Sequence, residues 1–263
     1  MWSRFAIAGL LLLVVVPSSP AASQRHRRSG VSLRKRLNVN DLITEPGTVE
    51  LEWGTLYSYS TAGWTMPSAL KFTPEGASLF RGRTEYSISF DSLASDVNTG
   101  VRSTQFGDRL TFAATSVLFD SRYFDLAVAP QVTTFLRNES GVRLGGTMIA
   151  RYDRAGNSVG LAVSWTAATA VTAGNPAGVW DFGAGYGRPL AATGLLGRIT
   201  PHVNTLLEKS TEFQRTLAAF GGVEYQVSKR IAVDVSGQRL GLTGLGPDRQ
   251  LLVSLTVNLG KLH

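Results

Sequence analysis

The chain has 263 residues, a formal charge of +7 and no cysteine. The lack of cysteine excludes disulfides, thiolate nucleophiles and cysteine metal sites. Seven of the 26 basic residues precede the first acidic residue, Asp41, so the remainder carries 19 basic and 19 acidic residues. Because these charges cancel, the rest of the chain does not offer the basic surface that binds phosphate backbones, and we therefore expect no nucleic-acid partner.

The first 47 residues differ in composition from the rest of the chain. Residues 1–23 combine Arg4, an apolar run over 5–16 and a stretch of small residues with prolines, and they predict a cleaved secretory signal peptide. The apolar run is shorter than the roughly twenty residues of a membrane-spanning helix. Residues 24–47 form a basic arm. Two interpretations stay open for it: a partly disordered, solvated tether, or a segment that contacts anionic headgroups or plugs a lumen.

Residues 48–263 alternate apolar with small or polar residues in segments of about ten. A period of two places successive side chains on opposite faces of a strand. The pattern predicts about twelve strands, over residues 49–59, 64–73, 85–91, 109–118, 124–136, 143–152, 158–166, 180–187, 198–208, 217–225, 231–238 and 251–259. The fold class that we expect is all-β: an antiparallel transmembrane β-barrel with an up-and-down meander.

The connections support a barrel with two different rims. Tight turns are expected near 120–122, 153–157 and 228–229, and longer loops near 93–105, 167–178 and 241–249. This asymmetry is typical of outer-membrane barrels, and an even strand count returns the C-terminus to the side of the N-terminus. Pro67 makes the second strand the weakest. Pro130 and Pro201 lie inside strands, so each requires a bulge or a local break, where the register can slip.

Charges of both signs on the polar face and aromatic residues near the strand ends favour a watered lumen and a lipid-facing outer wall. The candidate lumen-lining residues are Glu50, Glu52, Glu85, Asp91, Arg109, Asp125, Arg143, Arg151, Asp181, Arg198, His202, Glu224 and Asp234. The candidate membrane-interface aromatics are Tyr57, Tyr59, Trp64, Phe90, Trp165 and Trp180 at one rim, and Tyr152, Tyr186 and Tyr225 at the other.

Four stretches carry a resemblance to a known family: GTVELEWGTLYSYS, FGDRLTFAATSVLFD, YQVSKRIAVDVSGQRLGLTG and LLVSLTVNLG. With the order of the elements, they resemble the outer-membrane transporter family labelled "MetA pathway of phenol degradation" over about residues 45–260. The resemblance implies an outer-membrane channel and no catalytic signature. One departure is the end of the chain, Leu262-His263, where many barrels finish on an aromatic residue that the assembly machinery recognises.

Catalytic chemistry finds little support in the sequence. His202 is the one histidine among the strands, its phase is lumenal, and no G-x-S-x-G motif occurs. We expect no catalytic residues, no metal site and no cofactor. Glu50, Glu52, Glu85 and Asp91 could bind a cation, or pair across the lumen with Arg109, Arg143 or Arg151. We favour the pairing, which would give a mixed-charge lumen of weak ion selectivity.

We therefore expect a channel in the cell outer membrane of a Gram-negative-type cell that passes or takes up small molecules, including hydrophobic or aromatic ones. Its partners would be outer-membrane lipid and the outer-membrane assembly machinery, with an unknown solute. The first alternative is a structural or adhesive outer-membrane barrel without transport. The second is a soluble periplasmic ligand-binding β-barrel, in which the apolar face would be a protein core.

Overall fold

The computed structural model describes residues 43–59, 63–75, 83–98, 101–105, 109–136, 141–171, 177–211, 216–239 and 249–261. The predicted signal peptide 1–23, and all of the predicted arm 24–47 except residues 43–47, lie outside this part. Within it no helix is both long and apolar enough to cross a membrane. The strands are β1 (Thr48–Ser58), β2 (Gly63–Thr73), β3 (Thr84–Asn98), β4 (Val101–Gln105), β5 (Arg109–Asp120), β6 (Phe124–Phe135), β7 (Val142–Arg154), β8 (Asn157–Ala168), β9 (Gly178–Gly187), β10 (Ile199–Ser210), β11 (Thr216–Gln226), β12 (Ile231–Arg239) and β13 (Gln250–Lys261), with a 3-10 turn η3 (Leu196–Arg198) before β10.

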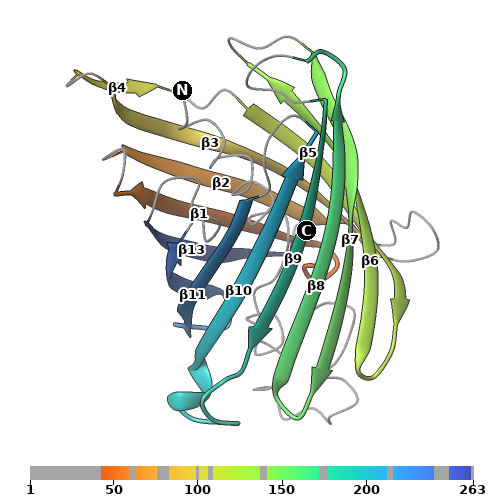
Figure 1. Cartoon of the computed structure of the whole chain (residues 1–263). Helices are drawn as coiled ribbons and strands as arrows, with labels where there is room; N and C mark the ends of the chain where they lie inside the picture. Colours follow the sequence, from red (N-terminus) through yellow and green to blue (C-terminus); the bar gives the residue numbers. More distant parts are fainter. Residues whose placement is uncertain are drawn as a thin grey trace.

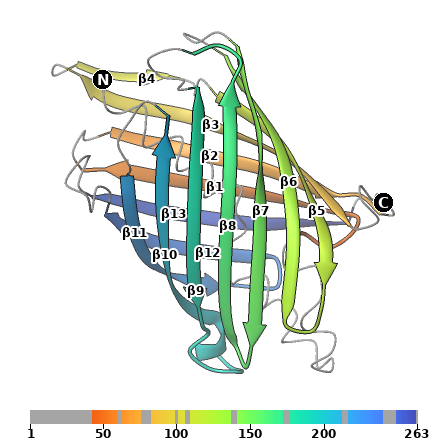
Figure 2. The ribbon, with the colours of Figure 1, turned by 45° about the vertical axis from the view of Figure 1, so that its right-hand side comes forward.

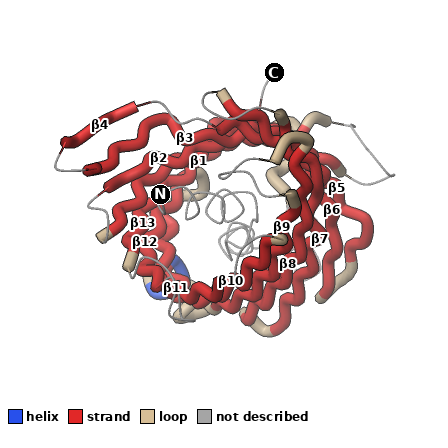
Figure 3. Tube along the Cα trace, turned by 45° about the horizontal axis from the view of Figure 1, so that its top comes forward, coloured by secondary structure: helices blue, strands red, loops and turns tan. Residues whose placement is uncertain are grey.

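The strands close into a barrel. Each strand pairs antiparallel with the next along the chain, except that β3 pairs with both β4 and β5, and β1 closes the ring by pairing with β2 and β13. Twelve strands thus form the wall, and β4 extends β3 beyond it (Figures 1 and 2). The view along the axis shows a ring around a central lumen (Figure 3). The predicted antiparallel twelve-stranded barrel is confirmed.

The two phases of each strand have opposite environments. In β13, Leu251, Val253 and Leu259 are exposed on the outer face, whereas Gln250 is buried on the inner face. Trp165 in β8 is 44 % exposed, between the buried Ser164 and Thr166. Large apolar side chains on the outside and polar ones within invert the arrangement of a soluble barrel, so this is the fold of a transmembrane barrel.

The barrel has two rims, which we name from the first strand. The near rim is the end where β1 begins and β13 ends, since Thr48 pairs with Lys261; the far rim is the opposite end. The tight turns at 121–123, 155–156 and 227–230 lie at the near rim, but so do the longer connections 74–83 and 188–198. The predicted loop 93–105 is wrong, because β3 runs to Asn98 and β4 pairs back onto it.

The three prolines are accommodated in different ways. Pro67 lies at a register shift in the pairing of β2 with β3. The register does not slip at Pro130: β6 stays in step with β7, and the ladder with β5 only omits the pairs of Ala129 and Pro130, because the proline has no N–H to donate. Pro201 precedes the ladder with β9, which begins at His202. The expected slip is therefore absent at Pro130 and Pro201.

Aromatic side chains form groups at both rims. At the far rim the rings of Trp165 and Trp180 are 6.3 Å apart, and those of Tyr57 and Tyr59 are 5.0 Å apart. The far-rim group also includes Trp64 and Phe90, which are half-buried on the outer face. At the near rim Phe119 and Phe124 are 6.1 Å apart, and Tyr152, Tyr186 and Tyr225 lie on the same outer face. Such rings suit the two headgroup layers of a bilayer.

Candidate functional site

The candidate site is the inner wall of the barrel, which is lined by Ser, Thr and Gly together with charged residues. The acidic residues at buried or half-buried inward positions of the described strands are Glu50, Glu52, Glu85, Asp125, Asp153, Asp181, Glu208, Glu224 and Asp234. The basic residues at such positions are Lys71, Arg109, Arg143 and Arg151. Nine acids against four bases give this wall a formal excess of negative charge.

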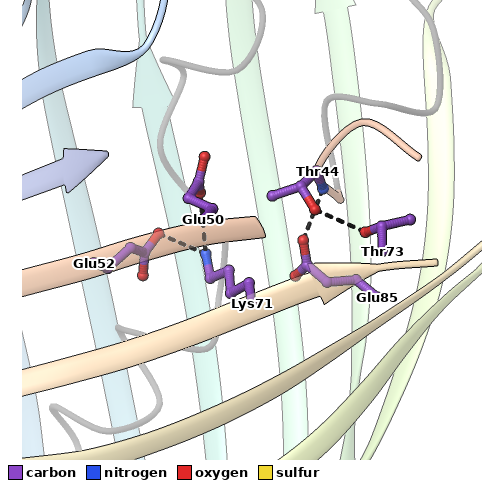
Figure 4. A network of polar contacts seen from close by, with 6 residues as sticks. All are labelled: Thr44, Glu50, Glu52, Lys71, Thr73 and Glu85. Atoms are coloured by element: carbon purple, nitrogen blue, oxygen red, sulfur yellow. Dashed lines mark hydrogen bonds and ion pairs between the residues drawn. The ribbon is translucent and has the colours of Figure 1, made fainter. Parts of the chain in front are cut away.

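Lys71 holds together the acidic residues of β1 (Figure 4). The register of β1 and β2 places it directly opposite Glu50. Its Nζ is 2.5 Å from Oε1 of Glu52 and 3.9 Å from Oε1 of Glu50. These glutamates thus contact a lysine on the neighbouring strand, where the sequence had suggested a cation or the arginines across the lumen.

Glu85 binds the chain segment that precedes β1. Its Oε2 accepts a hydrogen bond of 2.7 Å from the backbone N–H of Thr44, and the Thr44 hydroxyl is 2.7 Å from Oγ1 of Thr73 (Figure 4). The chain reverses at residues 45–48, where Gly47 adopts a φ of +78° that favours glycine. Residues 43–45 therefore lie inside the barrel, against the inner wall.

The inner face of β9–β12 forms an acidic wall, which we define as Asp181, Glu208, Glu224 and Asp234. Asp181 lies directly opposite Glu208 in the pairing of β9 with β10, and Glu224 directly opposite Asp234 in the pairing of β11 with β12. Like charges at directly opposed positions destabilise a sheet. At described inward positions of β8–β13 no Lys or Arg occurs, so the basic residues of the wall all lie on β2–β7.

Each of the three arginines of the wall contacts a residue of its own strand or of an adjacent strand. Nη1 of Arg143 donates a hydrogen bond of 3.0 Å to the Thr166 hydroxyl. Nε of Arg151 is 2.5 Å from Oδ2 of Asp153, and Arg151 lies opposite Asp125 in the pairing of β6 with β7. The guanidinium of Arg109 lies 5.5 Å from the centre of the Phe135 ring. The described wall of β1–β7 thus carries both signs, with five acidic and four basic residues, whereas β9–β12 carries the four acids of the acidic wall.

His202 is held by hydrogen bonds at both ring nitrogens. Its Nε2 is 2.5 Å from Oδ2 of Asp234, and Nδ2 of Asn204 is 3.2 Å from its Nδ1. The hydroxyl of Ser236 donates to Oδ1 of Asp234 at 2.7 Å, not to the histidine. A catalytic serine needs a hydrogen bond to the base that activates it, so these residues are not arranged as a Ser-His-Asp triad.

Arg198 and Asp91 differ from the other candidate lumen residues. Arg198 belongs to η3, ahead of β10, and its Nη1 donates to the carbonyl of Val227 at 3.3 Å, so it lies at the near rim instead of along the wall. Asp91 belongs to β3, but its side chain is not among those that the structure describes. Sequence reasoning left Lys71, Asp153 and Glu208 out of the candidate set. All three are at inward positions of the period-two pattern, which is the signal that could have found them.

Within the described residues no group of three or more His, Asp or Glu side chains is arranged to hold a metal ion. The acidic residues of β1 surround an ammonium group, and those of the acidic wall come in pairs. The arrangement can bind or guide a cation electrostatically, without forming a coordination site.

The fold is that of solved porins. A structure of NanC porin aligns with a TM-score of 0.57 and 10% identity, over 80% of this chain and all 100% of that chain. A structure of KdgM porin aligns with a TM-score of 0.54 and 9% identity, over 81% of this chain and 99% of that one. KdgM porin in complex with disordered oligogalacturonate gives 0.52 and 10%, over 81% and 99%.

At these identities the likeness shows the fold alone. No family model and no curated protein matches the sequence, so the resemblance to the phenol-degradation family stays a prediction. What the comparisons and the wall establish together is a porin-like antiparallel barrel with an apolar exterior and an acid-rich interior.

Proposed function

We propose that this protein is an outer-membrane channel that passes small hydrophilic solutes by diffusion and favours cations over anions. The observation that carries the proposal is the inner wall of a closed barrel, with nine acidic and four basic residues at described inward positions. The porin-like fold and the apolar exterior support the membrane location and the channel. The predicted export signal supports an address in the outer membrane.

The charge count shifts the expected selectivity. Mixed charges in balance would discriminate weakly between ions, whereas an excess of carboxylates raises the local concentration of cations and lowers that of anions. The opposed pairs of the acidic wall strengthen the effect, because each pair is relieved when a positive charge lies between its members.

The composition of the wall also bears on the solute. Its buried inward residues are largely Ser, Thr, Asn, Gln and charged residues. Such side chains can replace the water around a polar solute, but they offer little apolar surface for an aromatic solute. Barrels of about twelve strands are narrow compared with porins of sixteen or more. We therefore favour small, water-soluble cations or neutral polar molecules over the hydrophobic or aromatic class that the sequence had suggested.

Reversal potentials in planar bilayers under a salt gradient test the proposal. The double variant Asp181→Asn, Glu208→Gln removes one acid pair and should lower the cation-to-anion permeability ratio about twofold or more. Lys209→Gln is the matched control, because this neighbour of Glu208 is exposed on the outer face. Preference for anions in the unaltered protein, or equal shifts in both variants, would contradict the proposal.

A structural or adhesive barrel is the second candidate, and one observation favours it. β3 and β4 pair beyond the wall at the far rim, which gives the barrel a projecting sheet edge (Figures 1 and 3). Exposed edges of this kind can add a strand from a partner. Absence of current from every form of the protein, with or without residues 24–42, would favour this role over transport.

A further inference from the structure

The near rim of the barrel carries an uneven distribution of exposed charges. Within the described chain, the exposed basic residues of this rim are Arg122, Arg154, Arg188, Lys229 and Arg230. Its exposed acidic residues are Glu45, Glu75 and Asp120. Beyond Asp120 along the chain, every exposed charge of the described rim is positive, so this side of the rim attracts anions.

Two of these arginines converge on one aromatic ring. Arg122 and Tyr123 belong to the turn between β5 and β6, and Arg154 is the last residue of β7. A hydrogen bond of 2.8 Å from the N–H of Asp153 to the carbonyl of Tyr123 holds that turn against the end of β7 at the near rim (Figure 1). The guanidinium carbons of Arg122 and Arg154 lie 4.8 Å and 6.0 Å from the centre of the Tyr123 ring. Both distances are those of cation–π contacts, so one ring holds two positive charges close together.

The carboxylates near this arginine pair do not neutralise it. Neither guanidinium forms an ion pair with an acidic residue of the described chain. Asp153 is buried on the inner face, where it contacts Arg151. Asp120 lies opposite Asp125, which also faces inward. An anion that bound between the two guanidiniums would relieve their repulsion, and a phosphate would accept planar, paired hydrogen bonds from them.

Apolar side chains lead from the arginine pair along the outer wall. Tyr152 precedes Arg154 by two residues on the same face of β7, and it lies opposite Phe124 in the pairing of β6 with β7. The ring of Phe119 is 6.1 Å from that of Phe124, and all three aromatic side chains are exposed. A ligand held by the arginines can therefore lay an apolar part over these rings. A phospholipid joins an anionic phosphate to acyl chains in this order, whereas a free anion has no apolar part to place there.

We propose that Arg122, Tyr123 and Arg154 bind the phosphate of an anionic phospholipid in the leaflet at the near rim. The acyl chains of that lipid lie over Phe119, Phe124 and Tyr152. The ring of Tyr123 keeps the two guanidiniums together, so the site recognises one headgroup instead of only raising the local concentration of anions. The inference rests on the membrane location of the barrel but not on transport, because a barrel that carries no current can still bind the lipid.

Native mass spectrometry of the detergent-solubilised protein measures this binding. The protein is titrated with phosphatidylglycerol, which is anionic, and with phosphatidylcholine of the same acyl chains, whose phosphate is neutralised by its own ammonium group. We expect phosphatidylglycerol to bind about fivefold or more tightly than phosphatidylcholine, and Arg122→Gln with Arg154→Gln to abolish this preference. Lys229→Gln with Arg230→Gln is the matched control, since it removes the same charge from exposed positions of the β11–β12 turn and should retain the preference. Equal affinity for the two lipids in the unaltered protein, or equal losses in the two double variants, would overturn the proposal.

A second pair of measurements separates a built site from net charge and from a site for free anions. Arg122→Lys with Arg154→Lys keeps both charges but loses the planar group that stacks on Tyr123 and binds phosphate through paired hydrogen bonds, so we expect the preference to fall about threefold or more. Full preference in this variant would show that charge alone attracts the lipid. Inorganic phosphate at the concentration of the lipid should not displace it, and displacement would show a free-anion site; either result would contradict the proposal. Far-ultraviolet circular dichroism of each variant checks that the sheet is retained, as we expect for substitutions at exposed positions.

Discussion

The strongest consequence of the fold concerns two neighbouring residues of β8 that face opposite environments. Leu161 points outward and is 54 % exposed, whereas Gly160 points inward, and a Cβ placed on it would meet no atom within 4 Å. Both lie close to the middle of β8, which spans Asn157–Ala168. An arginine placed at either position has nearly the same depth, so the two variants compare the inner and outer faces of the wall at one level of the barrel.

The expected magnitudes follow from that difference. Arginine on the lipid face near the middle of a bilayer costs about 2–4 kcal/mol. Leu161 is about 5 Å from the middle of its strand, so we expect Leu161→Arg to lower the unfolding free energy by about 2–3 kcal/mol, or about 30- to 150-fold in the equilibrium constant. Gly160→Arg puts its charge into the lumen opposite Arg151 and should cost no more than about 1 kcal/mol.

Urea titration of the protein in phospholipid vesicles, followed by tryptophan fluorescence, measures both values. Reversible folding must be shown for each variant, since only then do the midpoints report free energies. Equal losses in the two variants, or a larger loss for Gly160→Arg, would refute the assignment of the outer face to lipid.

The remaining predictions concern the inner wall. Lys71→Met removes the ammonium group that contacts Glu50 and Glu52, and it should destabilise the barrel by about 3–5 kcal/mol. Lys209 faces outward, so Lys209→Met should change stability by less than about 1 kcal/mol. Similar losses in both variants would contradict the role of Lys71. Gly145→Ala should destabilise the barrel by about 1–3 kcal/mol, because its Cβ would lie 2.0 Å from the carbonyl of Trp165. Gly160→Ala meets open space and should be neutral or stabilise by up to about 1 kcal/mol in the same titration, so an equal cost at both glycines would argue against the close approach at Gly145. Asp181→Asn with Glu208→Gln should lower cation preference in bilayers while Lys209→Gln does not, as set out above.

The alternation of apolar and polar residues was enough to predict the strands, their faces and the antiparallel barrel. Each wall strand separates lipid from the lumen, so its side chains alternate between apolar and polar with a period of two residues. The projecting part of β3 and β4 has no such boundary. Its residues DSLASDVN and VRSTQ show no apolar face, and sequence reasoning interpreted them as a loop.

The partners of the charged residues were harder to predict, because they depend on the register between strands. Glu50 and Glu52 meet Lys71 only because Glu50 lies opposite Lys71 in the pairing of β1 with β2. The same holds for the opposed acids Asp181 and Glu208, which are far apart in the sequence. Register is set by bulges and turns around the whole ring, and a single strand does not encode it.

Spin labels on β8 test whether lipid covers the apolar face of the barrel, because the native chain has no cysteine and each single-cysteine variant carries one label. Collision rates with oxygen, which partitions into lipid, and with a water-soluble nickel chelate would be measured in vesicles along residues 158–165. We expect a period of two, with high oxygen access at Val159, Leu161, Val163 and Trp165, and low oxygen access at Ser158, Gly160, Ala162 and Ser164. An absence of alternation, or the opposite phase, would show that hydrocarbon does not cover the apolar face.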